Sequence, residues 1–284
     1  MLDRTTAFGL DFLFPAGDVV IGRTLADHGE FAKPMSDFLI EHAEEPSGTL
    51  VDVGANIGAI CLPFAAARPA WRVIGVEPNR RLSGILATNA TVNRLLNVEV
   101  AQAACGAETG VIPFANPPLD LQGNMGTMAV GRLGDAEPAP TLMIRLDEIA
   151  PADTRLVKID AEGLDAEVLR GAPRLMSDIR PIWVVEAAVN HPQTSRAVIQ
   201  TLLDADYDVF WFFVTFASFK NLKNRRPVEP GRGDANVIAV PKGRRLTWSL
   251  PVVRSADDAR PGDAGAYSYL SRYGLFPVKG GAAS

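Results

Sequence analysis

A glycine loop with an acidic residue at its entrance is the first feature of this sequence that could do chemistry. In the stretch LVDVGANIGAIC, residues 50–61, Asp52 precedes Gly54, and Gly54 and Gly58 flank Asn56. Glycine lets the backbone approach a ligand closely. Dinucleotide sites use G-x-G-x-x-G, where helix amides face a pyrophosphate, but the spacing here is G-x-N-x-G. A carboxylate at this place would repel a pyrophosphate and favours a ligand with a positively charged end.

S-adenosylmethionine has such an end, because it carries an ammonium and a sulfonium and no phosphate. We therefore predict that Asp52 faces the methionyl part of this cofactor, directly or through water. The alternative is that Asp52 caps the following helix. Glu77 ends the next apolar run, WRVIGVEP, where an acidic residue can accept the two ribose hydroxyls of a nucleoside. A solvated carboxylate at a strand end is the alternative for Glu77 alone.

A second group of ionisable residues could activate a methyl acceptor. Methyl transfer needs the acceptor, the methyl group and the sulfur in line, and a neutral hydroxyl needs a general base or a metal. The stretch KIDAEG offers Asp160 and Glu162 at a predicted strand end, with Lys158 on the strand. We predict Asp160 over the methionyl end, Glu162 in the mouth of the site as a catalytic carboxylate, and Lys158 as a partner of one carboxylate. For Glu162, a helix N-terminal carboxylate is the alternative.

Four further polar residues are candidates at the same site. His191 follows the strand that Glu186 ends and is a candidate base, with a surface histidine as the alternative. Glu30 lies upstream of the loop, where we predict that it folds over the cofactor. Asp160, Glu186 and Asn190 carry oxygen ligands of the kind that suits Mg²⁺. Metal dependence is the weaker alternative, and we predict no metal ligands.

Alternating strands and helices must position these residues. Strands that alternate with helices predict βαβ units and a mostly parallel sheet with both faces covered. Such sheets bind ligands beyond the carboxyl ends of their strands, where the glycine loop and KIDAEG both fall. The last two strands have no helix between them and are predicted to pair antiparallel. The predicted strands are 49–54, 71–78, 97–105, 155–163, 180–187, 207–214 and 236–241, and the predicted helices are 56–68, 80–95, 165–176 and 194–205.

Three segments lie outside this alternation. Residues 1–48 form a lead-in or lid, with a helix predicted near KPMSDFLIEHAEE. An insert at 107–146 interrupts the main domain of residues 49–241, and we predict that it helps to form the acceptor pocket, with Asn124 and Met125 as lining candidates. Residues 242–284 are a C-terminal extension whose aromatic patch, 267–276, either packs back on the domain or forms a homodimer contact.

Composition limits the classes of partner. Of the 284 residues 47% are hydrophobic, which is enough for a large core, and the net charge of −5 gives no general reason to bind nucleic acid or an anionic membrane. Two cysteines do not suggest a disulfide framework. The N-terminal residues do not resemble a signal peptide, and no apolar run reaches the length of a membrane span. We therefore expect a cytoplasmic protein with a small-molecule partner.

Several motifs together resemble the FkbM-type methyltransferases. The resemblance extends over about residues 18–241 and implies the class I methyltransferase fold, which is a Rossmann-like, seven-stranded, mostly parallel sheet with helices on both faces and a last antiparallel strand. It implies S-adenosylmethionine as the methyl donor and transfer to a hydroxyl of a sugar or secondary metabolite. The motifs are VDVGANIG, GVEPN, AACGAETG, TLMIRLDEI and LVKIDAEGLDAEVLRGA, and the implied cofactor residues are Asp52, Gly54, Asn56, Gly58, Glu77 and the turn that starts at Ala104, which would pass the adenine.

Two other functions compete with this interpretation. An NAD-dependent oxidoreductase would use the same acidic residue for the ribose, but the missing third glycine and the position of Asp52 argue against it. A non-catalytic nucleotide-binding module with the same fold is the other alternative, against which the intact loop argues. Methylation of nucleic acid is disfavoured, because KIDAEG stands where such enzymes carry N/D-P-P-[YF].

Overall fold

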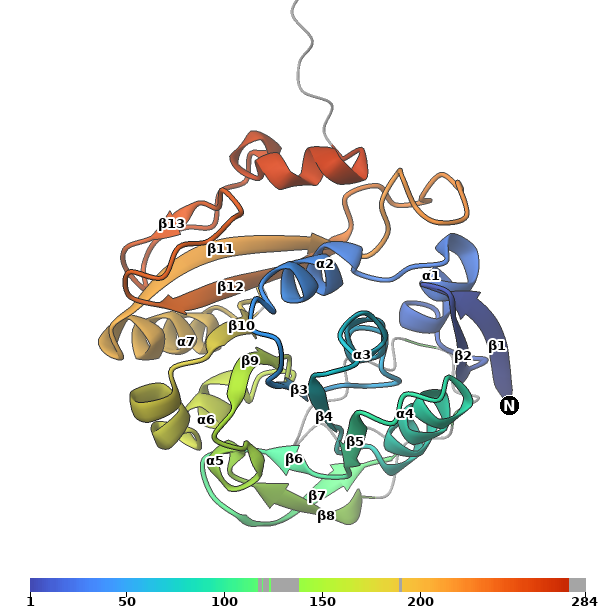
Figure 1. Ribbon diagram of the computed structural model, residues 1–284, viewed down its shortest axis with the longest axis horizontal. Helices are drawn as coiled ribbons and strands as arrows, with labels where there is room; N and C mark the ends of the chain where they lie inside the picture. The colour runs from blue at the N-terminus through green and yellow to red at the C-terminus, as the bar shows by residue number, and fades with distance from the viewer. Residues whose placement is uncertain (117–118, 120–122, 124–137, 189–190, 276–284) are drawn as a thin grey trace, which may run out of the picture.

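An eight-stranded sheet runs through the middle of the computed structural model, which describes residues 1–116, 119, 123, 138–188 and 191–275 (Figure 1). The strand order is β13-β11-β12-β10-β9-β3-β4-β5. The bounds are β3 (Thr49–Val53), β4 (Arg72–Val76), β5 (Val98–Ala101), β9 (Thr154–Ile159), β10 (Ile182–Glu186), β11 (Tyr207–Thr215), β12 (Gly233–Pro241) and β13 (Val252–Val253).

The pairing directions confirm a mostly parallel sheet with an antiparallel strand near its end. Strands β5, β4, β3, β9 and β10 are parallel to one another, whereas β12 pairs antiparallel with both β10 and β11. The predicted antiparallel pairing of the last two strands is therefore confirmed. The sheet has one strand more than the seven that the resemblance implies. The two-residue strand β13 pairs with the edge strand β11, and the Gly- and Pro-rich tail around it carries no strand pattern.

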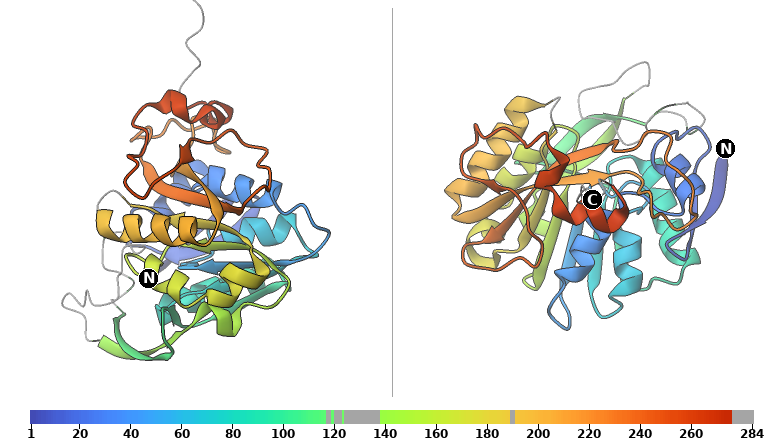
Figure 2. Two further views of the ribbon diagram at one scale, coloured as in Figure 1. Left: turned by 90° about the vertical axis from the view of Figure 1, so that its left-hand side faces the viewer. Right: turned by 90° about the horizontal axis from the view of Figure 1, so that it is seen from above.

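Helices cover both faces of this sheet (Figure 2). The helices α2 and α3 pack together on one face, while α6 and α7 pack together on the other. Helix α4 begins after Asn79, whose side chain accepts hydrogen bonds from the amides of Arg81 and Leu82 as an N-cap. The predicted helix 165–176 is shorter than expected, because α6 ends at Arg170 and a π-helical turn, Leu175–Ile179, follows after Gly171 and Pro173. The helix bounds are α1 (Ile21–His28), α2 (Lys33–Glu41), α3 (Cys61–Ala67), α4 (Arg80–Val92), α5 (Leu146–Ile149), α6 (Asp165–Arg170) and α7 (Pro192–Asp204).

The core lies on both faces of the central strands. All five residues of β3 are buried, and so are the first four of β10. Both cysteines, Cys61 and Cys105, are free and buried. Burial on both faces explains the near-continuous apolar runs that the sequence shows at these strands.

The lead-in folds as a hairpin that is fastened to α4. Strands β1 (Leu2–Ala7) and β2 (Leu10–Pro15) pair antiparallel. The Asn89 side chain accepts from the amide of Leu13, and its amino group donates to the carbonyls of Leu13 and Ile57. One buried amide thus joins the hairpin, helix α4 and the glycine loop. The predicted helix near residue 37 is confirmed as α2, but the hairpin was not predicted.

Two strands of the insert and the short strand before it form a separate, three-stranded sheet of order β6-β8-β7. The predicted strand 97–105 is divided, because β5 ends at Ala101 and β6 (Ala104–Cys105) pairs with β8 (Pro138–Ile144) instead of β4. Strand β7 (Gly110–Ala115) pairs antiparallel with β8. The predicted lining residues Asn124 and Met125 lie outside the described residues.

The aromatic patch of the extension packs back on the domain. Its short 3₁₀ helices are Ala264–Ala266 and Ser268–Tyr273. The hydroxyl of Tyr269 donates to the carbonyl of Phe213 at 2.7 Å and accepts from the amide of the same residue at 2.9 Å. Tyr267 and Tyr273 are also buried, while Phe276 lies outside the described residues. In the part of the chain that the structure describes, no helix has both the length and the apolar character to cross a membrane.

Replacing Asn89 tests how strongly the lead-in depends on this amide. Asn89→Ala leaves the carbonyl of Ile57 and the backbone groups of Leu13 without their partners, and an unsatisfied buried group costs about 1–3 kcal/mol. We expect a loss of roughly 2 kcal/mol or more in the free energy of unfolding, measured by urea denaturation. Thr88→Ala, on the exposed side of the same helix, is the control and should change it by about 0.5 kcal/mol or less. Equal effects of the two substitutions would contradict this role.

Candidate active site

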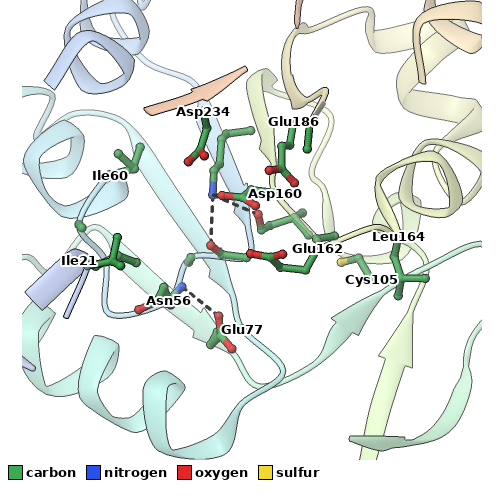
Figure 3. Close-up of a pocket in the computed structure, with 18 of the residues that line it drawn as sticks. Ile21, Asn56, Ile60, Glu77, Cys105, Asp160, Glu162, Leu164, Glu186 and Asp234 are labelled. Carbon is green, nitrogen blue, oxygen red and sulfur yellow. Dashed lines mark hydrogen bonds and ion pairs between the residues drawn. The ribbon is translucent and has the colours of Figure 1, made fainter. Parts of the chain in front are cut away.

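A cavity of about 510 Å³ opens at the carboxyl ends of the central parallel strands, where sheets of this type bind ligands (Figure 3). Residues that follow β3, β4, β9 and β10 line it together with the first residues of β12. Aromatic side chains of the lead-in, the insert and β11 complete its wall. The polar and aromatic lining residues are Asn56, Glu77, Lys158, Asp160, Glu162, Glu186, Asp234, Arg260, Phe31, Phe114, Phe213 and Phe216.

The glycine loop forms one side of the cavity. Gly54 has a φ of 74°, and a Cβ at this position would lie 1.9 Å from the carbonyl oxygen of Asp160. Only glycine fits, because the loop passes directly over the end of β9. Asn56 also has a positive φ, of 51°, which turns its backbone amide toward Glu77. Gly54 and Asn56 both line the cavity.

Gly58 has a packing role, while its contact with the cofactor stays a prediction. It does not line the cavity, and a Cβ here would lie 2.6 Å from side-chain carbons of Leu62 and Leu86. With a φ of 90° it turns the chain into α3 while α3 and α4 pack against it. The second glycine of G-x-N-x-G is therefore required by the helices behind the loop.

Glu77 lies at one end of the cavity, beside the loop (Figure 3). Its two carboxylate oxygens accept hydrogen bonds from the amides of Asn56, at 2.9 Å, and Asn79, at 2.8 Å. Burial raises its pKa to about 7, although both hydrogen bonds act in the opposite direction. The side chain is only 6% exposed, which rules out a solvated strand end. Ala104 and Cys105 line the cavity as well, and both are buried.

Asp52 is buried and does not line the cavity, and its contact with the methionyl part, directly or through water, stays a prediction. It belongs to β3, is 1% exposed, and does not cap α3. Its register partner on β9 is Lys158, whose Nζ lies 3.1 Å from Asp52 Oδ1. Burial raises the pKa of Asp52, and the Lys158 ammonium opposes that rise. A neighbouring strand therefore supplies the cation that the sequence pattern had assigned to a ligand, and the prediction of Lys158 as a carboxylate partner agrees with this contact.

Four carboxylates gather at the other end of the cavity, away from Glu77 (Figure 3). Asp160 and Glu162 follow β9, Glu186 ends β10, and Asp234 belongs to the start of β12. Burial and then the charge of Asp160 raise the pKa of Glu162 to about 8, and the same two causes raise that of Glu186 to about 10. Glu162 has a left-handed φ of 49°, which is uncommon outside glycine and asparagine. Charge repulsion among these groups favours the protonated form of some of them at neutral pH.

Asp234 is the member of this group that sequence reasoning missed. It is part of GRGD, which reads as a turn before the last strand, whereas β12 already begins at Gly233. An antiparallel strand starts at the edge where its parallel neighbours end. The predicted pairing direction could therefore have placed Asp234 at the site. Burial raises its pKa to about 7, although the residue keeps access to solvent.

Two predicted residues do not reach the cavity. His191 occupies the N-cap position of α7 without capping it, and it does not line the cavity. Glu30 is fully buried and accepts hydrogen bonds from the amide and the hydroxyl of Ser218. It thereby fastens the lead-in to the segment after β11, while the adjacent Phe31 stacks on Phe216 and forms the wall. Phe31, and not Glu30, therefore lines the cavity.

The described residues contain no cluster of three or more histidine, cysteine, aspartate or glutamate side chains arranged to hold a metal ion. Asp160 and Glu186, two of the three groups considered for Mg²⁺, do line one cavity. The third, Asn190, lies outside the described residues.

The strand order, the glycine loop and the cavity at the carboxyl edge together define a class I, Rossmann-like methyltransferase fold. The family model for the methyltransferase FkbM domain matches residues 52–209, which is more than half of the chain. The chain belongs to the FkbM methyltransferase family. This assignment favours a methyltransferase over the NAD-dependent oxidoreductase.

Solved structures with related folds are distant from this chain. The methyltransferase FkbM from Methylobacillus flagellatus is 19% identical with a TM-score of 0.48, and the match covers 72% of this chain and 47% of that one. The chain thus spans about half the length of that relative. A precorrin-6y C5,15-methyltransferase from Geobacter metallireducens is 14% identical (TM-score 0.47; 74% and 88% covered). The O-methyltransferase TomG from Streptomyces achromogenes is also 14% identical (TM-score 0.46; 75% and 79% covered). No curated protein matches the chain.

The raised pKa values predict how stability depends on pH. A carboxyl whose folded pKa exceeds its unfolded value of about 4.5 contributes stability that is fully present below that value. This contribution is lost as the pH rises through the folded pKa, which is about 8 for Glu162 and about 10 for Glu186. We therefore expect the melting temperature to fall between pH 6 and pH 9. The fall should be larger than for a protein whose carboxylates are all exposed.

Glu186→Gln isolates one of these groups. The amide cannot ionise, so the variant should melt about 2 °C or more above the wild type at pH 9, since 1 kcal/mol corresponds to roughly 2–4 °C in a chain of this size. The two proteins should converge toward pH 5. Glu99→Gln, in an exposed ion pair with Arg72, is the control. A wild type that is more stable at pH 9 than at pH 6 would refute the assigned protonation states.

Proposed function

We propose that this chain transfers a methyl group from S-adenosylmethionine to a hydroxyl oxygen of a small molecule, such as a sugar or a secondary metabolite. S-adenosylmethionine supplies an electrophilic methyl group on a sulfonium. The observation that carries the proposal is a single cavity. One end holds the carboxylate of Glu77, which is placed to bind a ribose, and the other end holds a group of carboxylates. The glycine loop of a methyltransferase family lies between the two ends.

The loop end of the cavity fits a nucleoside. Each oxygen of Glu77 accepts one backbone hydrogen bond, so each retains a lone pair for a ribose hydroxyl. The carboxylate is fixed in place by these bonds before a ligand arrives, which lowers the entropic cost of binding. Ala104 and Cys105 offer backbone groups and an apolar surface suited to an adenine ring.

The acidic end fits a positively charged donor and an acceptor that must lose a proton. Carboxylates near the sulfonium would stabilise its charge, and Asp160 lies beside the loop through the contact of its carbonyl with Gly54. Glu162 points into the same cavity, and no neighbouring basic group forms an ion pair with it in the described residues. We assign Glu162 as the general base that accepts the hydroxyl proton and Asp160 as the residue that orients the donor.

Calorimetry with S-adenosylhomocysteine tests the donor site. We expect micromolar binding to the wild type and a loss of about tenfold or more in Glu77→Ala, because a hydrogen bond to a charged group contributes about 1.5–3 kcal/mol. Glu99→Ala changes an exposed carboxylate outside the cavity and should bind as the wild type does. No binding by the wild type would overturn the proposed function, and an unaffected Glu77→Ala variant would move the nucleoside elsewhere.

The pH profile of methyl transfer tests the base. Only the ionised form of Glu162 can accept a proton, so kcat/KM should fall as the pH decreases below about 8. The positive charge of the bound donor will move this limb toward lower pH. Glu162→Gln should lower kcat by about a hundredfold or more while leaving S-adenosylhomocysteine affinity within a few-fold. S-adenosylhomocysteine formation from a panel of hydroxyl-bearing acceptors is the readout, and a Glu162→Gln variant with an unchanged profile would exclude this base.

A further inference from the structure

Lys158 is a buried cation beneath the glycine loop. Its side chain rises from the central strand β9 and lines the cavity, although the residue is only 5% exposed. The ammonium donates to the carbonyl of Gly54 at 3.1 Å and to that of Val53 at 3.4 Å. One lysine therefore binds the first glycine of the loop directly.

The same ammonium also contacts two carboxylates. Nζ lies 3.1 Å from Asp52 Oδ1 and 3.6 Å from Asp160 Oδ2. Burial would lower the pKa of Lys158, but the charges of Asp52 and Asp160 outweigh it and raise the pKa, so the cation persists throughout the neutral range. Asp52 is 1% exposed on its side chain, whereas the side chain of Asp160 is 39% exposed and faces the cavity.

The contacts of the Lys158 ammonium fall into two groups. One is with a buried carboxylate, and the other is with oxygen atoms of residues that line the cavity. The pair with Asp52 neutralises a charge that would otherwise be buried without compensation. The contacts with Gly54 and Asp160 concern two oxygen acceptors that line the cavity where the glycine loop meets the acidic group. The carbonyl oxygen of Gly54 keeps a further lone pair after it accepts from Lys158, while Asp160 Oδ2, at 3.6 Å, forms an ion pair with the ammonium and keeps its lone pairs. A lysine that only neutralised Asp52 would not need to reach them.

We propose that Lys158 is a positioning residue of the donor site, which holds the carbonyl of Gly54 and the carboxylate of Asp160 in the arrangement that receives the positively charged end of the methyl donor. This inference rests on the proposed function, because it assumes that the donor lies along the glycine loop. Lys158 accepts no proton and forms no bond with the methyl group. It contributes by preventing the two acceptors from reorienting when the ligand binds.

A charge-balanced pair of variants separates the two roles. In Asp52→Asn combined with Lys158→Met, no buried charge remains at position 52, and Asp160 is exposed enough to stay hydrated without the lysine. Asp52→Asn alone keeps Lys158 on Gly54 and Asp160. Lys242→Met is the matched control, because Lys242 forms an exposed ion pair with Asp206 far from the cavity. Each protein is compared by melting temperature and by calorimetry with S-adenosylhomocysteine.

We expect Asp52→Asn and Lys242→Met to bind S-adenosylhomocysteine within about threefold of the wild type, and the double variant to bind about tenfold more weakly or worse, which corresponds to ~1.4 kcal/mol or more. A folded double variant with wild-type affinity would show that Lys158 only neutralises Asp52, and would overturn the inference. An Asp52→Asn variant that binds S-adenosylhomocysteine tenfold more weakly would also overturn the inference. This measurement can be made even if the double variant does not fold. A wild type without affinity would instead reject the proposed function itself.

Discussion

The close passage of the glycine loop over the end of β9 is the constraint on which the rest of the site depends. No side chain fits between Gly54 and the carbonyl of Asp160. The loop that follows β3 and the acidic segment that follows β9 are therefore held in direct backbone contact. The amide of Asp160 also donates to the carbonyl of Val53, which adds a second tie between the two strand ends. Main-chain packing therefore places the proposed donor-binding loop and the proposed catalytic carboxylates side by side before any side chain contributes.

Around this contact, buried polar side chains join segments that are distant from one another in the sequence. Lys158 lies between Asp52 and Asp160, Asn89 joins the lead-in hairpin to the loop, and Glu30 ties the lead-in to Ser218. Each of them is buried, so each would be costly without its partner. Their shared effect is to fix backbone segments that border the cavity, while the cavity-facing surface is left to Glu77, the acidic group and the phenyl rings.

Much of the fold could be predicted from the sequence, because parallel strands buried on both faces leave apolar runs that alternate with helical patterns. The site was predictable where a residue follows directly from its place at a strand end, as for Glu77, Asp160 and Glu162. It was not predictable where the partner comes from a different part of the chain. Asp52 and Gly58 belong to a cofactor motif, yet their surroundings are set by Lys158 and by Leu62 and Leu86. Sequence spacing does not report which neighbour satisfies a buried charge or fills a turn.

The predicted site differs from the structure in two ways, and the two have different physical reasons. Glu30 is predicted at the site because it lies in the lead-in, and His191 because it follows the end of a central strand, but Glu30 is buried against Ser218 and His191 lies at the start of α7. Asp234 was overlooked because a glycine-rich tetrapeptide resembles a turn. In a sheet with one reversed strand, the first residues of that strand belong to the same edge as the last residues of its neighbours.

Because the reversed strand β12 borders the cavity, the two ends of the cavity come from different parts of the chain. The donor end is built from β3 and β4, near the beginning of the family domain, whereas Glu186, Asp234 and Arg260 come from the later segments of the chain. Under the proposed function, substitutions in the β11–β12 hairpin would change how the acceptor binds and would leave in place the loop and Glu77, which are proposed to bind the cofactor.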